Sequence, residues 1–173
     1  MAAPLRIRPA TVDDAAAIAR IYNEGIRGRG ATFETRERSA ADIRPWFDDP
    51  RFPVLVAEDG DVVVGWAAAS SYRTRACYAG VAEYSIYVAT SHHGRGVASV
   101  LFPVFLDALA RAGFWKVLSR LFPENTASRA LCARHGFREV GIYRRHARLD
   151  GSWRDVVIVE RLLGDAAADA GER

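Results

Sequence analysis

Residues 84–101 read YSIYVATSHHGRGVASVL, and their character changes halfway along. Apolar residues alternate up to Val88, as in a β-strand, and an apolar run typical of a helix resumes at Val97. The turn between them, HHGRGVA, contains Gly94 and Gly96. We therefore expect a strand that enters a helix through a basic turn rich in glycine.

A turn of this kind is suited to hold an anion. The first N–H groups of a helix have no partner within the helix and carry a partial positive charge. Gly94 and Gly96 let the backbone approach a ligand closely, and Arg95 adds charge. Two nucleotide-binding patterns do not fit. The phosphate-binding loop of NTPases, GxxxxGK[ST], needs a lysine, and none follows Gly96. The dinucleotide-binding pattern GxGxxG needs a third glycine, which is missing here. A phosphate-binding turn and a purely structural turn both remain open from spacing alone.

The remainder of the chain alternates between strand-like and helix-like patterns. Strands are expected at residues 5–10, on both sides of the turn Asp59-Gly60, and at residues 82–89, 115–122, 137–149 and 154–163, the last two joined at Asp150-Gly151. Helices are expected at residues 15–26, after Ser39, and at residues 99–113 and 125–136. These elements predict an α/β fold with one mixed sheet of six or seven strands, flanked by about four helices.

Proline complicates one of these helices. Pro103 lies seven residues after Gly96 and removes one helical N–H group. The helix is therefore expected either to bend there or to begin later, and a later start would withdraw its N-terminus from the glycine turn.

The size and composition favour one soluble domain. The chain has 173 residues, of which 50% are hydrophobic, and this suits a single core within residues 1–164 followed by a flexible tail at residues 165–173. A net charge of only +3 disfavours a protein that binds nucleic acid mainly by charge. Lys116 is the only lysine among 24 basic residues, which fits either anion recognition by arginine or a compositional bias.

Other features exclude further classes of function. Cys77 and Cys132 lack the spacing of a zinc site or a disulfide framework, and His92 and His93 are adjacent and point apart, so no metal is expected. The N-terminus has no signal-peptide core, and no apolar run is long enough to cross a membrane. These observations predict a cytoplasmic protein with neither a membrane nor a nucleic-acid partner.

Residues 93–98, HGRGVA, resemble the [Q/R]-x-x-G-x-[G/A] signature with which the GCN5-related N-acetyltransferases (GNAT superfamily) hold the pyrophosphate of acetyl-CoA. His93 at the first position departs from that signature. Residues 124–137, ENTASRALCARHGF, resemble the second motif of the superfamily, an asparagine followed by a helix of small residues that ends in Gly-Phe. The resemblance implies a single-domain GNAT fold with a mostly antiparallel sheet, and acetyl-CoA as co-substrate.

Further segments narrow the resemblance to one branch. ATFET, FPVLVAE, VGWAAASSYR, VAEYSIYV and GSWRDVVIVER are similar to the phosphinothricin N-acetyltransferases. Within that branch, NEGI, CYAGVAEYSIYV and WKVLSRLFPEN are most similar to the arsinothricin N-acetyltransferases. The branch implies a homodimer that acetylates the α-amino group of a toxic amino acid resembling glutamate and so gives resistance. Methionine sulfoximine or sulfone, another small amine, and a CoA-binding domain without catalysis are the alternatives.

The resemblance also assigns site residues. It implies that the cofactor contacts Ile86, Tyr87, Val88, His93, Gly94, Arg95, Gly96, Val97, Ala98, Ser99, Asn125 and Ser128. It implies that the substrate contacts Thr32, Phe33, Glu34, Arg73, Arg75 and Tyr78. Arginine can bind a phosphinate, arsonate or carboxylate through two hydrogen bonds, although both arginines could also be solvated loop residues and Phe33 could belong to the core.

Glu83 matches the position of the branch's general base. An α-amino group is mostly protonated near neutral pH, so a base must remove its proton for attack on the thioester. The strand period of two places Glu83, Ser85 and Tyr87 on one face. Without the resemblance, a glutamate exposed at the start of a strand would be the simpler interpretation.

One position departs from the superfamily in a way that bears on catalysis. Seven residues after Asn125, where a tyrosine or histidine often protonates the departing thiolate, this chain has Cys132. A buried cysteine is usually inert packing. Cys132 could therefore be structural, with the CoA thiolate leaving unassisted or protonated by Tyr143.

Overall fold

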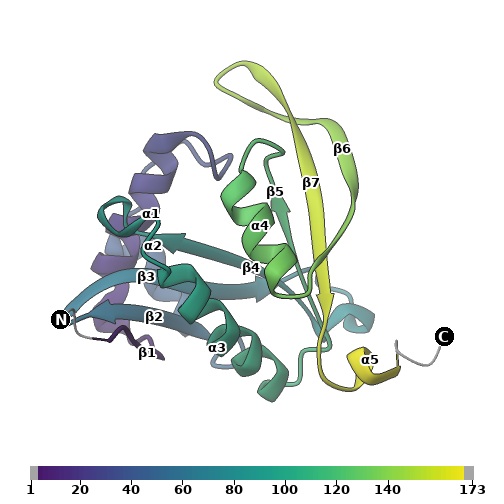
Figure 1. The fold of residues 1–173 in the computed structure, drawn as a ribbon, viewed down its shortest axis with the longest axis horizontal. Coiled ribbons are helices and arrows are strands. Elements are labelled where there is room, and N and C mark those ends of the chain that lie inside the picture. The colour runs from purple at the N-terminus through teal and green to yellow at the C-terminus, as the bar shows by residue number, and fades with distance from the viewer. Residues whose placement is uncertain (1–3, 170–173) are drawn as a thin grey trace.

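The computed structural model describes residues 4–169 as seven strands in one sheet with five helices (Figure 1). The strands are β1 (Arg6–Pro9), β2 (Val54–Asp59), β3 (Val62–Ser71), β4 (Val81–Val88), β5 (Lys116–Leu121), β6 (Arg138–Leu149) and β7 (Ser152–Leu162). Their spatial order is β1-β2-β3-β4-β5-β7-β6, and only the pair β4–β5 is parallel. The predicted mixed, mostly antiparallel sheet is therefore confirmed.

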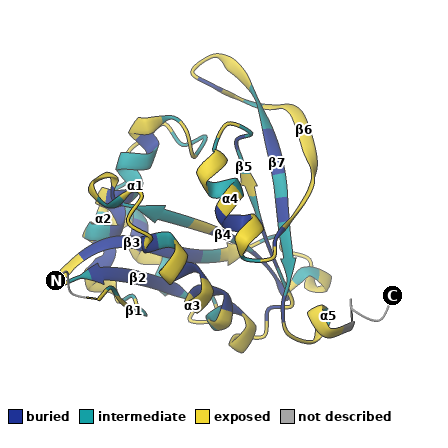
Figure 2. Cartoon of the chain, in the orientation of Figure 1, coloured by how far each residue is buried: buried dark blue, intermediate teal, exposed yellow. Residues whose placement is uncertain are grey.

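Helices cover both faces of the first half of the sheet. They are α1 (Ala15–Gly28), α2 (Ala40–Ile43), α3 (Val97–Arg111), α4 (Thr126–Arg134) and α5 (Gly164–Asp169). On one face, Ile18 and Ile21 of α1 pack with Trp66 of β3. On the other, Phe102 and Phe105 of α3 pack in a separate cluster. Figure 2 shows the result, with β2 and β3 buried between helices and β6 exposed at the opposite edge.

Local sequence signals explain several boundaries. Ser39 caps α2 by accepting a hydrogen bond from the N–H of Asp42, as its spacing predicts. The hairpin between β2 and β3 turns at Gly60, which has φ +60°, and the hairpin between β6 and β7 turns at Asp150 and Gly151, both with positive φ. The turn positions predicted from Asp-Gly pairs thus lie within a residue of those observed.

The start of one helix settles an alternative that the sequence left open. Helix α3 begins at Val97, directly after the turn, because Val100 N–H already bonds to Gly96 O at 3.2 Å, and Pro103 is accommodated inside the helix. A later start of that helix is thereby ruled out. Within the predicted tail at residues 165–173, the structure places most of α5, where three consecutive alanines favour helix, and residues 170–173 lie outside the described range.

The central strands diverge, and this divergence creates the site. β4 pairs with β5 at only three positions, Val81, Ala82 and Glu83. Beyond Glu83, β4 continues beside β3 alone, whereas β5 continues beside β7. Figure 1 shows the two strands running apart. One edge of β4 is therefore left without a neighbouring strand.

No helix within residues 4–169 is both long and apolar enough to traverse a lipid bilayer.

Glycine in α1 allows that helix to pack against β4. A Cβ at Gly25 would lie 2.5 Å from the ring of Tyr87, which is stacked on Trp66 with centroids 4.9 Å apart. We expect Gly25→Ala to lower the free energy of unfolding by about 1–3 kcal/mol through overpacking, despite the better helix propensity of alanine. Urea unfolding followed by circular dichroism measures this change.

Gly28 supplies the matched control in the same helix. A Cβ there would meet no atom within 4 Å, so Gly28→Ala should leave stability unchanged or raise it. Equal effects of the two substitutions would show that packing against Tyr87 does not limit this position.

Candidate active site

Two joined clefts open where β4 and β5 diverge. The larger has a volume of about 940 Å³ and runs between the end of α1, the free edge of β4, the N-terminus of α3 and α4. The smaller has a volume of about 510 Å³ and reaches Glu83. The residues that line both are Ala31, Ile86, Tyr87, Asn125, Ser128 and Leu131. A molecule in one cleft can therefore meet a molecule in the other at this junction.

Hydrogen bonds show which way the free edge of β4 faces. Ser119 Oγ donates to the carbonyl of Tyr84 at 3.0 Å, and the His93 ring Nε2 bonds to the carbonyl of Val88 at 2.9 Å. Both carbonyls thus point away from β3. Because backbone groups alternate along a strand, the N–H and C=O of Ile86 also point into the opening. They form a backbone donor and acceptor suited to an extended amide-bearing chain.

The larger cleft ends at the N-terminus of α3. Gly94 and Gly96 have φ of +74° and +79°, and a Cβ on either would meet nothing within 4 Å. The first N–H groups of α3 therefore open onto uncrowded space, where an anion can approach. The residues present fit the pyrophosphate of acetyl-CoA.

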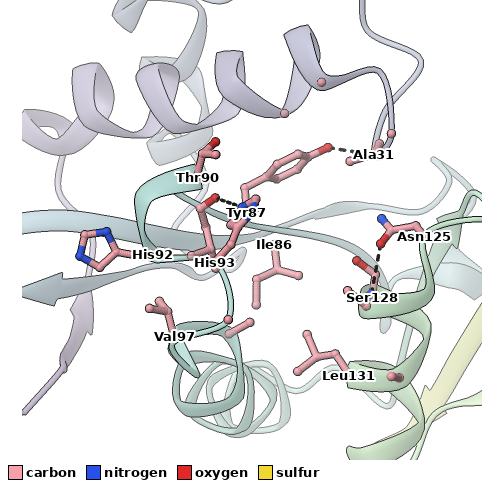
Figure 3. A pocket seen from close by; sticks show the side chains of 18 of the residues that line it. Ala31, Ile86, Tyr87, Thr90, His92, His93, Val97, Asn125, Ser128 and Leu131 are labelled. Carbon is pink, nitrogen blue, oxygen red and sulfur yellow. Dashed lines mark hydrogen bonds between the residues drawn. The ribbon is translucent and has the colours of Figure 1, made fainter.

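Most of the predicted cofactor residues lie on this cleft, and Figure 3 shows several of them around it. They are Ile86, Tyr87, Val88, His93, Gly94, Gly96, Val97, Ala98, Ser99, Asn125 and Ser128. Arg95 is exposed and is absent from the lining that the described residues provide. Its predicted contact with the cofactor has no support in the arrangement of the turn.

His93 stabilises the turn from within. A carbonyl oxygen can only accept, so Nε2 of His93 carries the hydrogen that bonds to Val88. This bond joins the first residue of the signature to the last residue of β4. The histidine thus connects the strand to the turn, and its Nε2 is not available for a phosphate.

Helix α4 begins at the junction of the clefts. The Asn125 side chain accepts a hydrogen bond from Ser128 N–H at 3.1 Å, which caps the helix (Figure 3). The cap fixes both residues beside Ile86. The asparagine motif therefore positions a second helix N-terminus at the point where the clefts meet.

The smaller cleft contains the predicted base. Arg120 Nη1 donates to Glu83 Oε2 at 2.8 Å, and no described residue bonds to the other carboxylate oxygen. Thr32, Phe33 and Glu34 also line this cleft, and Phe33 packs edge to face on Phe122 with centroids 4.9 Å apart. The carboxylate is held in position with one oxygen open to accept a proton.

The structure does not bring the predicted substrate arginines into the site. Within residues 4–169, neither cleft is lined by Arg73, Arg75 or Tyr78. The Arg73 guanidinium lies over the Tyr72 ring at 5.1 Å, and Tyr72 packs edge to face with Tyr78 at 5.5 Å. This exposed segment is occupied by its own aromatic contacts, so its predicted role as an anion clamp is not supported.

Arg120 and His146 are among the lining residues that the sequence analysis did not assign. Arg120 lies on β5 two residues after Leu118, the partner of Glu83, and so on the same face of the sheet as Glu83. The sequence predicts that Arg120 lies in a strand, but it does not predict that this strand pairs with β4. His146 reaches the smaller cleft from β6, and no local sequence signal marks it as a site residue.

Neither candidate proton donor for the thiolate reaches the clefts. Cys132 is buried, its thiol lies 2.9 Å from the Tyr84 hydroxyl, and burial raises the pKa of the thiol. Tyr143 is 52% exposed on β6 and lines neither cleft. Cys132 therefore acts as core packing in contact with Tyr84. In the described part of the chain, no cluster of three or more His, Cys, Asp or Glu side chains is arranged to hold a metal ion.

Comparisons with known proteins agree with this geometry. Residues 16–137 match the family described as Acetyltransferase (GNAT) family. A phosphinothricin N-acetyltransferase of Streptomyces coelicolor is 34% identical, over 93% of this chain and 98% of that protein. An L-methionine sulfoximine/L-methionine sulfone acetyltransferase of Salmonella typhimurium is 28% identical, over 95% of this chain and 98% of that protein.

A solved structure matches the fold. It is a GNAT superfamily phosphinothricin acetyltransferase of Sinorhizobium meliloti in complex with acetyl-CoA, with a TM-score of 0.87 and 27% identity. The match covers 95% of this chain and 91% of that one.

The conformation of Gly96 should matter for cofactor binding. Alanine is strained at φ +79° by about 1–2 kcal/mol, and relieving that strain would move the first N–H groups of α3. We expect Gly96→Ala to weaken binding of coenzyme A about tenfold, measured by titration calorimetry.

Gly113 provides the control at the other end of the same helix. Its φ is +86°, so Gly113→Ala should reduce stability in urea to a similar extent while the affinity for coenzyme A stays unchanged. Equal losses of affinity in the two variants would contradict a direct role of the turn.

Proposed function

The chain belongs to the acetyltransferase (GNAT) family and is an acetyl-CoA-dependent N-acetyltransferase, and we propose that it acetylates the α-amino group of a glutamate-mimicking amino acid of the phosphinothricin or arsinothricin type. One observation carries this proposal. Glu83, which has one carboxylate oxygen without a bond to a described residue, lines a small cleft that joins the cofactor cleft beside Ile86. A base, an acceptor site and a backbone donor are thus contiguous.

The roles of the residues follow from this arrangement. Acetyl-CoA, when bound, supplies an acetyl thioester whose carbonyl must be polarised towards attack. The outward-facing N–H of Ile86 is a fixed donor of the kind that stabilises developing negative charge on such an oxygen. The N-terminus of α3 would hold the pyrophosphate, and Asn125 and Ser128 would contact the pantetheine arm.

Glu83 would remove the proton from the acceptor. Amino groups attack only as the free base, so a carboxylate within reach of the amine, directly or through one water, is required in the acceptor cleft. Arg120 fixes the carboxylate through Oε2 and leaves the second oxygen for the amine. Attack would then proceed directly on the bound thioester.

The lining of the smaller cleft favours an anionic amino acid over a polyamine. Arg120 and His146 can both donate to an anion, and the Phe33 and Phe122 rings provide an apolar wall for a short aliphatic chain. Glu34 is paired with Arg38 and so presents little free negative charge to a polycation. The phosphinothricin-type relatives support the same substrate class, and the methionine sulfoximine/sulfone relative makes those neutral analogues the second candidate.

We further propose that the enzyme works in the cytoplasm as a homodimer and gives resistance to such an amino acid. The apolar side chains exposed on the β6–β7 hairpin support an interface there: Val140, Ile142, Tyr143 and Trp153 are each 46–56% exposed. Analytical ultracentrifugation measures the assembly, and a monomer at micromolar concentration would contradict this part of the proposal.

Release of the CoA thiol tests the assignment of Glu83. With phosphinothricin, arsinothricin and methionine sulfoximine as acceptors, Glu83→Gln should lower kcat by about 10²–10⁴-fold, the range expected for loss of a general base. The KM for acetyl-CoA should stay near that of the unmodified protein, because Glu83 does not line the cofactor cleft.

The control is Glu139→Gln, which removes another exposed glutamate paired with an arginine. Arg129 Nε donates to Glu139 Oε1 at 2.7 Å, and Glu139 lines neither cleft, so its loss should not change kcat. An unchanged kcat in Glu83→Gln would show that Glu83 is not the general base. An unmodified protein that binds acetyl-CoA but releases no thiol with any acceptor contradicts the proposed function.

A further inference from the structure

The β6–β7 hairpin carries a break in register beside the acceptor cleft. Tyr143 pairs with Val156, and the next pair is Ala147 with Arg154. Residues 144–146 therefore stand opposite Asp155 alone. Extra residues of this kind bend a strand and redirect its side chains, and such bulges are frequent next to active sites.

The bulge is held in a specific conformation. Arg145 has φ +49°, in the left-handed region that few residues other than glycine adopt. Its N–H donates to Asp155 Oδ1 at 2.7 Å, so the single residue opposite the bulge also fixes it. Strained backbone that a neighbouring side chain maintains is typical of functional sites.

The bulge places His146 on the acceptor cleft. His146 lines that cleft together with Glu83 and Arg120, which come from β4 and β5. The hairpin extends on past the cleft, and Asp150 at its tip pairs with Arg29 at the end of α1 at 2.9 Å. In Figure 1 this hairpin rises beyond the body of the sheet and its tip turns towards the α1 side. The hairpin thus extends from the acceptor cleft, which His146 lines, to the end of α1.

The two carboxylates that line the acceptor cleft with His146 already have partners. Glu83 is bonded to Arg120, and Glu34 is paired with Arg38. Within residues 4–169 no group hydrogen-bonds to the His146 ring, whose closest aromatic contact is Tyr143 at 4.9 Å between centroids. An imidazole N–H on the wall of this cleft is therefore available to a ligand.

We propose that His146 is a specificity-determining residue that hydrogen-bonds to the second acidic group of the acceptor, its phosphinate, arsonate or side-chain carboxylate. This inference rests on the proposed function and names the residue that separates acidic acceptors from neutral ones. Arg120 remains hydrogen-bonded to Glu83, the proposed base, and the His146 imidazole binds the acidic group at the end of the acceptor's side chain.

Steady-state kinetics with two acceptors tests the proposal. His146→Leu should raise the KM for phosphinothricin about 10- to 100-fold, as expected for loss of a hydrogen bond to a charged group. The KM values for methionine sulfone and for acetyl-CoA should change by less than about twofold, because neither ligand carries the acidic group at that end. His146→Gln, which keeps an N–H donor, should restore much of the affinity for phosphinothricin.

Two further variants control for structure. Arg148→Leu alters an exposed residue of the same strand whose guanidinium lies over Trp153 at 4.3 Å, and it should change none of these constants. Asp155→Ala removes the acceptor of the Arg145 N–H, so it should raise the KM for phosphinothricin in the same direction as His146→Leu.

Binding is measured as well as turnover, so that this inference and the proposed function can fail separately. Titration of phosphinothricin into the CoA-saturated protein should show weaker binding to His146→Leu than to the unmodified chain, whether or not acetyl is transferred. Equal losses for phosphinothricin and methionine sulfone, no loss for either, or no binding of phosphinothricin to the unmodified chain would each overturn the inference. Absence of thiol release with normal binding would count against the proposed function alone.

Discussion

The site depends on the short pairing of β4 with β5, which ends at Glu83. A strand in the middle of a sheet normally satisfies its backbone groups on both sides. Here the second half of β4 has a strand partner on the β3 side only, and the opposite side presents backbone donors and acceptors that no strand pairs. The last paired residue is the proposed base, and the unpaired residues that follow face the cofactor cleft. The same divergence therefore opens both clefts and sets their positions relative to each other.

Side chains stabilise the divergence at each end. Ser119 on β5 bonds to the carbonyl of Tyr84 just after the last pair, and His93 in the turn bonds to the carbonyl of Val88. Between these two bonds the outward N–H and C=O of Ile86 and the outward N–H of Val88 have no bonding partner among the described residues and are free for a ligand. Val97 also packs closely over Gly65, where a Cβ would lie 3.0 Å from its Cγ1, so the start of α3 is fixed against β3. Polar bracing and close packing together keep the cleft preformed.

Local sequence signals predicted much of this fold, because those signals act over a few residues. The strand-turn-helix at residues 84–101, the cap at Ser39 and the two Asp-Gly hairpins depend on backbone preferences that a short window contains. The face of Glu83 follows from the strand period in the same way. Arg120 and His146 could not be assigned from local signals, since one depends on the pairing of β4 with β5 and the other on a bulge set by Asp155. The contact of Arg73 with Tyr72 was likewise not predicted, because no periodicity encodes it.

The two departures from the superfamily pattern have different consequences. His93 replaces a glutamine or arginine, yet its ring bonds to a backbone carbonyl and the turn still presents Gly94, Gly96 and the start of α3 to the cleft. That substitution changes the hydrogen bond that stabilises the turn, but it leaves the same backbone groups facing the cleft. Cys132 replaces a side chain that could give a proton, and its buried thiol, with a raised pKa and the Tyr84 hydroxyl as neighbour, lines neither cleft. The one residue proposed to accept a proton, Glu83, therefore lies in the acceptor cleft. At the position where the superfamily often has a proton donor for the departing thiolate, this chain has none.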